Sequence, residues 1–151
     1  MRKKDKEITD TKQIEGIIQK STICRLAMSE NDLPYIVPLC FGYKDRTLYF
    51  HSANIGKKLD ILKNNPNVCF EFEIDTCVEK NEEICSWGMK YRSVIGFGKA
   101  SFIDEPIEKQ NALDTIIQQY TDTTFEFTEK SLKSISVYKV DISSMTGKQA
   151  Q

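Results

Sequence analysis

The segment from Phe50 to Lys58 carries the densest group of side chains that could do chemistry. Its sequence, FHSANIGKK, ends an expected strand and places two lysines in the first turn of an expected helix. Cations are unfavourable there by roughly 0.3–1 kcal/mol each, because the helix dipole is positive at its N-terminus. A bound anion would reverse this, since free backbone N–H groups at the same place favour phosphate. Lys57 and Lys58 are therefore candidate phosphate-binding residues, with solvated surface lysines as the alternative interpretation.

His51, the one histidine of the chain, lies in the same segment. Its imidazole could act as a general acid or base, or could only donate a ring N–H within a half-buried strand. No Ser or Cys nucleophile stands in a known motif order with it. No second histidine or compact carboxylate cluster accompanies it, so the sequence predicts no metal site. The catalytic and the structural interpretation of His51 both remain open on these grounds.

Two further segments carry candidate ligand contacts. Pro38 interrupts the apolar run 35–41, and because proline cannot donate to a strand ladder, it indicates a sheet edge or a bulge. A bulge would expose backbone groups to a ligand, whereas a proline at an edge would only block pairing. In the segment 87–98, Arg92 could bind a phosphate through its planar guanidinium, and Trp87 could stack on a planar ring. Core packing is the alternative for these aromatic residues.

The elements that must position these residues are short. Asp10 is expected to cap a helix with three isoleucines at helical spacing, and Pro66 to end a second helix. Alternating apolar and polar residues predict the strands. The acidic segment 75–85 lacks any period and is expected to be a long connection. The expected strands are 22–28, 34–42, 47–53, 68–74, 91–103 and 134–142, and the expected helices are 11–20, 55–65 and one beginning at Asp104-Glu105-Pro106.

Short connections between the first strands imply antiparallel hairpins, because parallel pairing requires a long crossover. Gly96 and Gly98 suggest a bulge, a barrel corner or the close approach of a ligand. The pattern favours an α+β, mainly-β fold: a closed or nearly closed antiparallel barrel with peripheral helices. An open α+β sandwich remains possible. The length of 151 residues fits a single domain spanning 1–151.

Composition excludes several classes of protein. With 21 basic and 22 acidic residues the formal net charge is −1, which lacks the general attraction that nucleic-acid binding requires. Five cysteines without a CxxC pair disfavour a disulfide framework. The longest apolar run is far shorter than the ~20 residues of a membrane helix, and the basic N-terminus leads into no apolar signal region. We therefore expect a cytoplasmic protein that binds neither nucleic acid nor membrane.

Eight short segments, in order, carry a family resemblance. They are RKKDKEITD, CRLA, PYIVPLCFGY, TLYFHSA, GKKLDIL, NPNVCFE, YRSVIGFGKA and VDISSMTGK. Their order and spacing resemble the FMN-binding split-barrel superfamily of pyridoxamine 5′-phosphate oxidase-like proteins, specifically its nitroimidazole-resistance (Nim) branch. The resemblance implies a six-stranded antiparallel split barrel that pairs into a homodimer, with FMN in a groove at the dimer interface. FMN is expected ahead of FAD or haem.

The resemblance also assigns roles to residues. The strand around Pro38 would run along the isoalloxazine ring, and the two lysines would hold the phosphate. His51 matches the histidine that the Nim branch keeps beside the ring, which makes it the candidate for proton handling. The implied cofactor-binding residues are Val37, Pro38, Leu39, Cys40, His51, Ser52, Lys57, Lys58, Trp87, Arg92 and Ser93.

The function implied by the resemblance is an FMN-dependent oxidoreductase. Its substrates would be nitro-aromatic compounds of the 5-nitroimidazole type or related small electrophiles, with NAD(P)H as the candidate electron donor. The chain lacks the C-terminal Trp/Arg segment of true pyridoxamine phosphate oxidases, so pyridoxamine phosphate is not the expected substrate. The alternatives are a non-enzymatic flavin- or haem-binding carrier or sensor, and a barrel that binds no cofactor at all.

Overall fold

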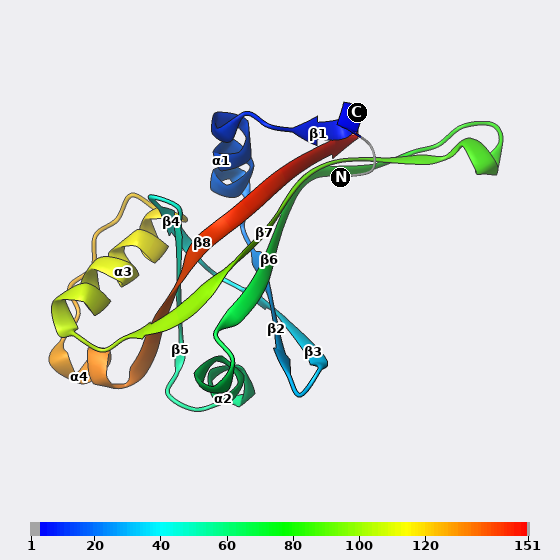
Figure 1. The fold of residues 1–151 in the computed structure, drawn as a ribbon. Helices are drawn as coiled ribbons and strands as arrows, with labels where there is room; N and C mark the ends of the chain where they lie inside the picture. The colour runs from blue at the N-terminus through cyan, green and yellow to red at the C-terminus, as the bar shows by residue number, and fades with distance from the viewer. Residues whose placement is uncertain (1–3, 151) are drawn as a thin grey trace.

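The computed structural model describes residues 4–150, and one antiparallel sheet dominates it (Figure 1). Its strands follow the order β3-β2-β6-β7-β8-β5-β4, and β1 pairs with β8. The helices are α1 (Thr11–Lys20), α2 (Lys57–Asn64), α3 (Pro106–Gln118) and α4 (Glu129–Lys133). The strands are β1 (Glu7–Ile8), β2 (Cys24–Glu30), β3 (Leu33–Leu39), β4 (Gly42–Lys44), β5 (Thr47–Ala53), β6 (Asn67–Glu79), β7 (Gly88–Ile103) and β8 (Ile135–Ala150).

The predicted α+β, mainly-β antiparallel fold is confirmed, but residues 4–150 form 8 strands where about six were expected. One reason is that the expected strand 34–42 divides into β3 and β4. Phe41 is fully buried at the division, and its N–H donates to the Tyr120 hydroxyl at 3.0 Å. Tyr120 in turn donates to the Thr22 carbonyl at 2.9 Å. Residues 40 and 41 thus carry the chain from one outer edge of the split barrel to the other.

The helices agree with the sequence pattern except at two places. Helix α1 has the predicted bounds, and the Asp10 carboxylate caps it by accepting from the Lys12 N–H at 3.0 Å. Helix α2 begins at Lys57 rather than at residue 55. Helix α4 was not predicted, because its 5 residues are too few to show a period. Among the helices of residues 4–150, none combines the length and apolar character that crossing a bilayer requires.

The position of Pro38 is that of an edge-strand residue. Strand β3 is an outer strand of the sheet, and its register with β2 is unbroken from Leu33 to Leu39. The edge interpretation is therefore confirmed and the bulge interpretation is wrong. A bulge does occur where the glycine pair suggested one, since the β7–β8 register shifts between Phe97 and Gly98.

The two faces of the sheet have different coverings. The inner face packs with α1 and α2 into the main core, where the Phe41 and Phe72 rings lie 4.8 Å apart. Helices α3 and α4 cover the outer face of β5 and β8, and their buried residues pack on Ile103 and Val137. No helix of the described residues 4–150 covers the outer face of β2, β6 and β7 (Figure 1).

The β6–β7 hairpin extends far beyond the rest of the sheet (Figure 1). The expected long connection over 75–85 is wrong: β6 continues to Glu79, which pairs with Gly88. The register shifts between Ile74 and Cys77, where Asp75 has a φ of 57°. Alternation is missing from this part of the sequence because the ribbon covers no core, and every residue from 75 to 90 is exposed. We call residues 75–90 the arm.

Candidate functional site

Strand β5 leads directly into α2, and this β5–α2 corner contains the candidate phosphate-binding segment. Asn54 fixes the turn from two sides: its Nδ2 donates to the Lys133 carbonyl at 2.9 Å, and Ser136 Oγ donates to its Oδ1 at 3.1 Å. Gly56, the residue that precedes α2, has φ 143° and ψ 154°, a conformation essentially restricted to glycine. The corner is therefore held in one conformation by partners outside the turn and by a residue without a side chain.

The first turn of α2 has the donors of an anion site. The Gly56 carbonyl accepts from the N–H groups of Leu59 and Asp60 at 2.9 and 3.3 Å, whereas those of Lys57 and Lys58 have no acceptor within residues 4–150. Apart from its chain neighbours, nothing in that range lies within 4 Å of a Cβ built on Gly56. An anion here would meet free backbone donors, the positive end of the helix dipole and two ammonium groups.

Lys57 connects this corner to the edge strand β3. Its Nζ lies 4.8 Å from the centroid of the Tyr35 ring, which is a cation–π contact. Val37 and Leu39 share a face with Tyr35, because alternate residues of a strand point the same way. All three pack against the main core while remaining partly exposed. The structure thus brings the predicted ring-binding strand beside the predicted phosphate-binding lysines.

Three predicted contacts lie at the margins of this arrangement. Pro38 is exposed on the opposite face of β3 from Tyr35, and Cys40 is exposed just beyond the strand. The Ser52 hydroxyl already donates to the Ala53 carbonyl at 3.0 Å, so it has only its acceptor capacity to offer a ligand. Pro38 therefore cannot contribute to the apolar face of β3 to which Val37 belongs.

His51 lies near the end of β5, on the outer face of the sheet opposite Val137. Partial burial lowers the pKa of His51 below its ordinary value of 6.5, and the positive charge of Lys58 lowers it further. The imidazole is therefore neutral at neutral pH and is sensitive to whatever binds Lys58. Within residues 4–150, no group of three or more His, Cys, Asp or Glu side chains is placed to hold a metal ion.

A histidine titration should show the effect of Lys58 directly. Because the chain has one histidine, its imidazole resonances in NMR report the pKa of His51 alone. We expect that pKa below 6.5 in the wild type and higher in Lys58→Gln, while Lys63→Gln, in the last turn of the same helix, should leave it unchanged. An unchanged pKa of His51 in Lys58→Gln would contradict the placement of Lys58 beside His51.

The lowered pKa of His51 also affects stability. The free energy of unfolding should fall as pH falls below 6.5, because the unfolded chain then binds the proton more tightly.

Trp87, Arg92 and Ser93 are not brought to the β5–α2 corner of their own chain. Trp87 lies at the tip of the arm, where its Nε1 donates to the Asn81 carbonyl at 2.9 Å. Arg92, at the base of the arm, forms an ion pair with Asp75, its Nε donating to Oδ2 at 2.7 Å. Ser93 follows on β7, whereas α2 lies near the other end of this hairpin (Figure 1).

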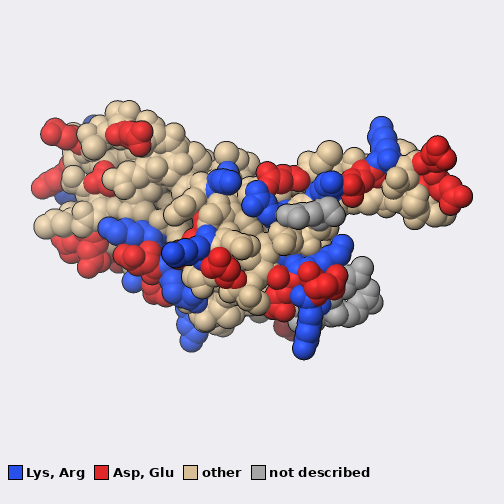
Figure 2. Space-filling view, turned by 90° about the horizontal axis from the view of Figure 1, so that it is seen from above, with Lys and Arg blue, Asp and Glu red and all other residues tan. Residues whose placement is uncertain are grey.

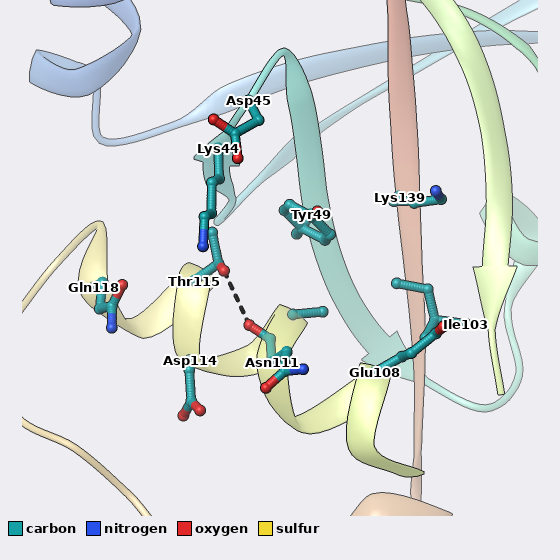
Figure 3. Close-up of a pocket in the computed structure, with 11 residues that line it drawn as sticks. Lys44, Asp45, Tyr49, Ile103, Glu108, Asn111, Asp114, Thr115, Gln118 and Lys139 are labelled. Carbon is teal, nitrogen blue, oxygen red and sulfur yellow. Dashed lines mark hydrogen bonds between the residues drawn. The ribbon is translucent and has the colours of Figure 1, made fainter. Parts of the chain in front are cut away.

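A cleft of about 680 Å³ lies between α3 and strands β4, β5 and β8 (Figure 3). None of the predicted site residues lines it, and its charged side chains have both signs, so it offers no concentrated positive charge for a phosphate. Sequence patterns do not indicate this cleft. Its lining residues are Lys44, Asp45, Tyr49, Ile103, Glu108, Asn111, Ala112, Asp114, Thr115, Gln118 and Lys139.

Two residues of the corner were missed by the sequence analysis. Tyr35 is an ordinary strand residue in the sequence, and its contact with Lys57 depends on how α2 folds back over β3. Gly56 was visible as a glycine immediately before two lysines. Its position ahead of the first helical turn is the signal that could have marked it, since a glycine there leaves the backbone N–H groups accessible to an anion.

The antiparallel split barrel, with a helix N-terminus and two lysines at its β5–α2 corner, defines the class of protein, and a family model confirms the relationship. The model described as pyridoxamine 5′-phosphate oxidase matches residues 10–149. The chain belongs to this family. The resemblance predicted from the sequence is therefore confirmed.

Similar proteins agree with this assignment. A structure of a candidate 5-nitroimidazole antibiotic resistance protein from Bacteroides thetaiotaomicron is 35% identical with a TM-score of 0.86, over 95% of this chain and 86% of that one. The FAD and heme binding protein from Mycobacterium smegmatis shares the fold at 17% identity and a TM-score of 0.88, over 97% of this chain and 74% of that one. An uncharacterized protein of Rhizobium meliloti is 30% identical over 64 residues, 42% of each chain.

Proposed function

We propose that this chain binds a flavin, FMN in particular, through the β5–α2 corner. The observation that carries the proposal is the pair Lys57 and Lys58 on a helix N-terminus whose first N–H groups have no acceptor within residues 4–150. These donors fit a phosphate monoester, and the absence of a side chain at Gly56 leaves room for it. The partly exposed apolar face of β3, with Val37 and Leu39, is the surface offered to the ring.

A homodimer is part of this proposal, and the uncovered outer face of the sheet supports it. Ile36, Ala27, Cys69 and Phe97 lie side by side across four strands. Ile36 is 60% exposed and Phe97 is 55% exposed, and Ile95 continues the patch along β7. Apolar patches on central strands of a sheet indicate an interaction surface. A second copy can supply the same patch in an isologous contact.

The reaction that we infer is the reduction of small electrophiles such as nitro-aromatic compounds. Bound FMN supplies two-electron transfer from a nicotinamide donor to the substrate. Lys57 and Lys58 bind and orient the phosphate. A phosphate beside Lys58 offsets the positive charge that lowers the pKa of His51, so His51 gains the ability to hold a proton near the bound substrate. Phosphate binding at the two lysines is thereby coupled to the protonation of His51.

Absorption spectroscopy and a turnover assay test the proposal together. Purified protein supplied with FMN and dialysed should retain flavin bands, and it should oxidise NAD(P)H in the presence of a 5-nitroimidazole. Retained flavin without turnover would favour the non-enzymatic carrier or sensor. A Soret band in place of flavin bands would move the proposal to haem binding. Neither chromophore, after both are offered, would overturn cofactor binding.

Replacing His51 by alanine should separate catalysis from binding. Positioned acid–base groups contribute roughly 10²–10⁴-fold to rate, so we expect turnover in His51→Ala to fall about 100-fold with FMN retained. Stopped-flow or steady-state assays with each substrate measure this. Tyr49→Phe, two residues earlier on the same face of β5, is the matched control and should leave the rate unchanged. A full rate in His51→Ala would remove the residue from catalysis.

A further inference from the structure

The turn at the β5–α2 corner is held mainly by the side chain of Asn54. The ladder between β5 and β8 ends at Ala53, and the hydrogen bonds of α2 begin at the Gly56 carbonyl. The turn between them is exposed, and because Ile55 is 87% exposed, it packs on no apolar core. In the described part of the chain, 4–150, only the Asn54 side chain gives this turn hydrogen bonds to another element.

The Asn54 side chain reaches the C-terminal end of α4 and the first residues of β8. Its Nδ2 donates to the carbonyl of Lys133, the last residue of α4, at 2.9 Å. The Ser136 hydroxyl donates to Asn54 Oδ1 at 3.1 Å. Carbonyls in the last turn of a helix have no partner within that helix, so they are available to a donor of this kind. We call these two hydrogen bonds the tether.

Helix α4 is itself fixed where the tether reaches it. Lys109 Nζ, from α3, donates to the carbonyls of Leu132 and Ile135 at 3.2 and 3.1 Å, on either side of Lys133. The Leu132 side chain is buried in the core that α3 and α4 form on the outer face of the sheet. The tether therefore joins the exposed turn to a well-packed part of the fold.

An ordered turn is important for a phosphate because positive charge is not concentrated elsewhere around it. Lys and Arg side chains are mixed with Asp and Glu side chains over the face shown in Figure 2, and the formal net charge is −1. A phosphate at the corner thus depends on local donors, which include the free N–H groups of Lys57 and Lys58. These groups follow Gly56, and glycine loses more conformational freedom on ordering than any other residue. A turn that is ordered before the ligand arrives binds it more tightly, because less entropy is lost on binding.

We propose that Asn54 is a positioning residue of the anion site, which holds the N–H groups of Lys57 and Lys58 in place by fastening the turn to α4. The inference rests on the proposed function and makes α4 a support of the flavin site. Both polar atoms of the Asn54 side chain are engaged by Lys133 and Ser136. Asn54 therefore acts through the turn rather than by touching the ligand.

Titration of flavin fluorescence tests this role. Asn54→Ala should weaken FMN binding about fivefold to tenfold, because two hydrogen bonds that order the site are lost. Riboflavin lacks the phosphate, so its affinity should be unchanged. Ser136→Ala should lose part of the FMN affinity, and Ser136→Thr, which keeps the hydroxyl, should lose none. Equal losses for FMN and riboflavin in Asn54→Ala, or no loss for either, would overturn the proposal.

Asn65 offers a matched control, because it fastens the other end of the same helix. Its Nδ2 donates to the Ser29 carbonyl at 3.1 Å, and its Oδ1 accepts from the Asn67 N–H at 3.2 Å. Asn65→Ala thus removes a comparable pair of hydrogen bonds, and it should lower the free energy of unfolding without changing FMN affinity. A loss of FMN affinity as large as that in Asn54→Ala would assign both asparagines to general stability and overturn the inference.

The tether can also be tested without a flavin, so failure of the inference can be distinguished from failure of the proposed function. Backbone amide relaxation in NMR should give residues 56–58 of the flavin-free wild type order parameters of about 0.85, falling below about 0.6 in Asn54→Ala. Unchanged order at these amides in Asn54→Ala would overturn the inference, whether or not FMN binds. Wild-type protein that binds no FMN, while these amides loosen in Asn54→Ala, would support the tether and overturn the proposed function alone.

Discussion

Replacing Lys57 and Lys58 together by alanine should weaken FMN binding by two orders of magnitude or more. Hydrogen bonds to charged groups contribute about 1.5–3 kcal/mol each, and a loss of about 3 kcal/mol for the pair corresponds to roughly 100-fold in the dissociation constant. Lys58 is half-buried beside His51, so screening by solvent is weaker there than at an exposed surface. Titration of flavin fluorescence at fixed, low ionic strength measures the change.

Two controls show whether the lost binding free energy comes from contacts with the phosphate of FMN. Lys63→Ala removes a lysine from the last turn of the same helix and should leave FMN affinity within about twofold. Riboflavin lacks the phosphate, so its weaker binding should be the same in the wild type and in the double variant. If riboflavin and FMN lose affinity equally, the lysines support the fold of the corner rather than the phosphate. Unchanged FMN affinity would remove the corner from cofactor binding.

Gly42→Ala should be among the most destabilising substitutions of a small residue in this chain. Strand β4 packs so closely on α3 that an added Cβ would lie 2.6 Å from the Ile116 nitrogen and from the Thr115 carbonyl carbon. Both are backbone atoms, so the contact is relieved only by moving the helix. Overpacking of this kind typically costs about 1–3 kcal/mol, occasionally more. Urea unfolding followed by circular dichroism measures the expected fall in the free energy of unfolding.

Gly16→Ala is the matched control for that substitution. Gly16 lies inside α1, and nothing outside its own helix and chain neighbours lies within 4 Å of an added Cβ. Alanine is favoured over glycine in helix interiors by about 1 kcal/mol, so this variant should be as stable as the wild type or more so. Equal unfolding midpoints for Gly16→Ala and Gly42→Ala would contradict the packing of α3 on β4.

Elements with one buried face could be predicted well from the sequence. Strand β5 has the predicted bounds because Leu48 and Phe50 are buried and alternate with residues on the other face. The arm escaped prediction because its residues bury nothing and so leave no alternation. The division between β3 and β4 was also missed, because the hydrogen bond that makes it comes from Tyr120, 79 residues later in the chain.

In the candidate site too, some features could be predicted from the sequence and others could not. Lys57 and Lys58 could be found from their place at the start of a helix, since the helix dipole makes that position unusual for cations. The contact of Lys57 with Tyr35 and the influence of Lys58 on His51 depend on how α2 folds back against β3 and β5. No spacing in the sequence encodes those contacts. The distance of Trp87 from the corner likewise depends on the continuous pairing of β6 with β7 out to Glu79 and Gly88, which the sequence does not indicate.

The hydrogen bonds of Tyr120 have a consequence for the order of folding. Its hydroxyl joins the backbone of Phe41 to that of Thr22, residues 79 and 98 positions earlier in the chain. Contacts between residues so far apart close late, because the entropy of a long loop must be lost before they form. The hydrogen bonds that tie Phe41 to Thr22 therefore form only after α3, which ends just before Tyr120, has docked. During synthesis, the residues of the β5–α2 corner would leave the ribosome well before Tyr120, so the fold around the proposed flavin site would be completed late.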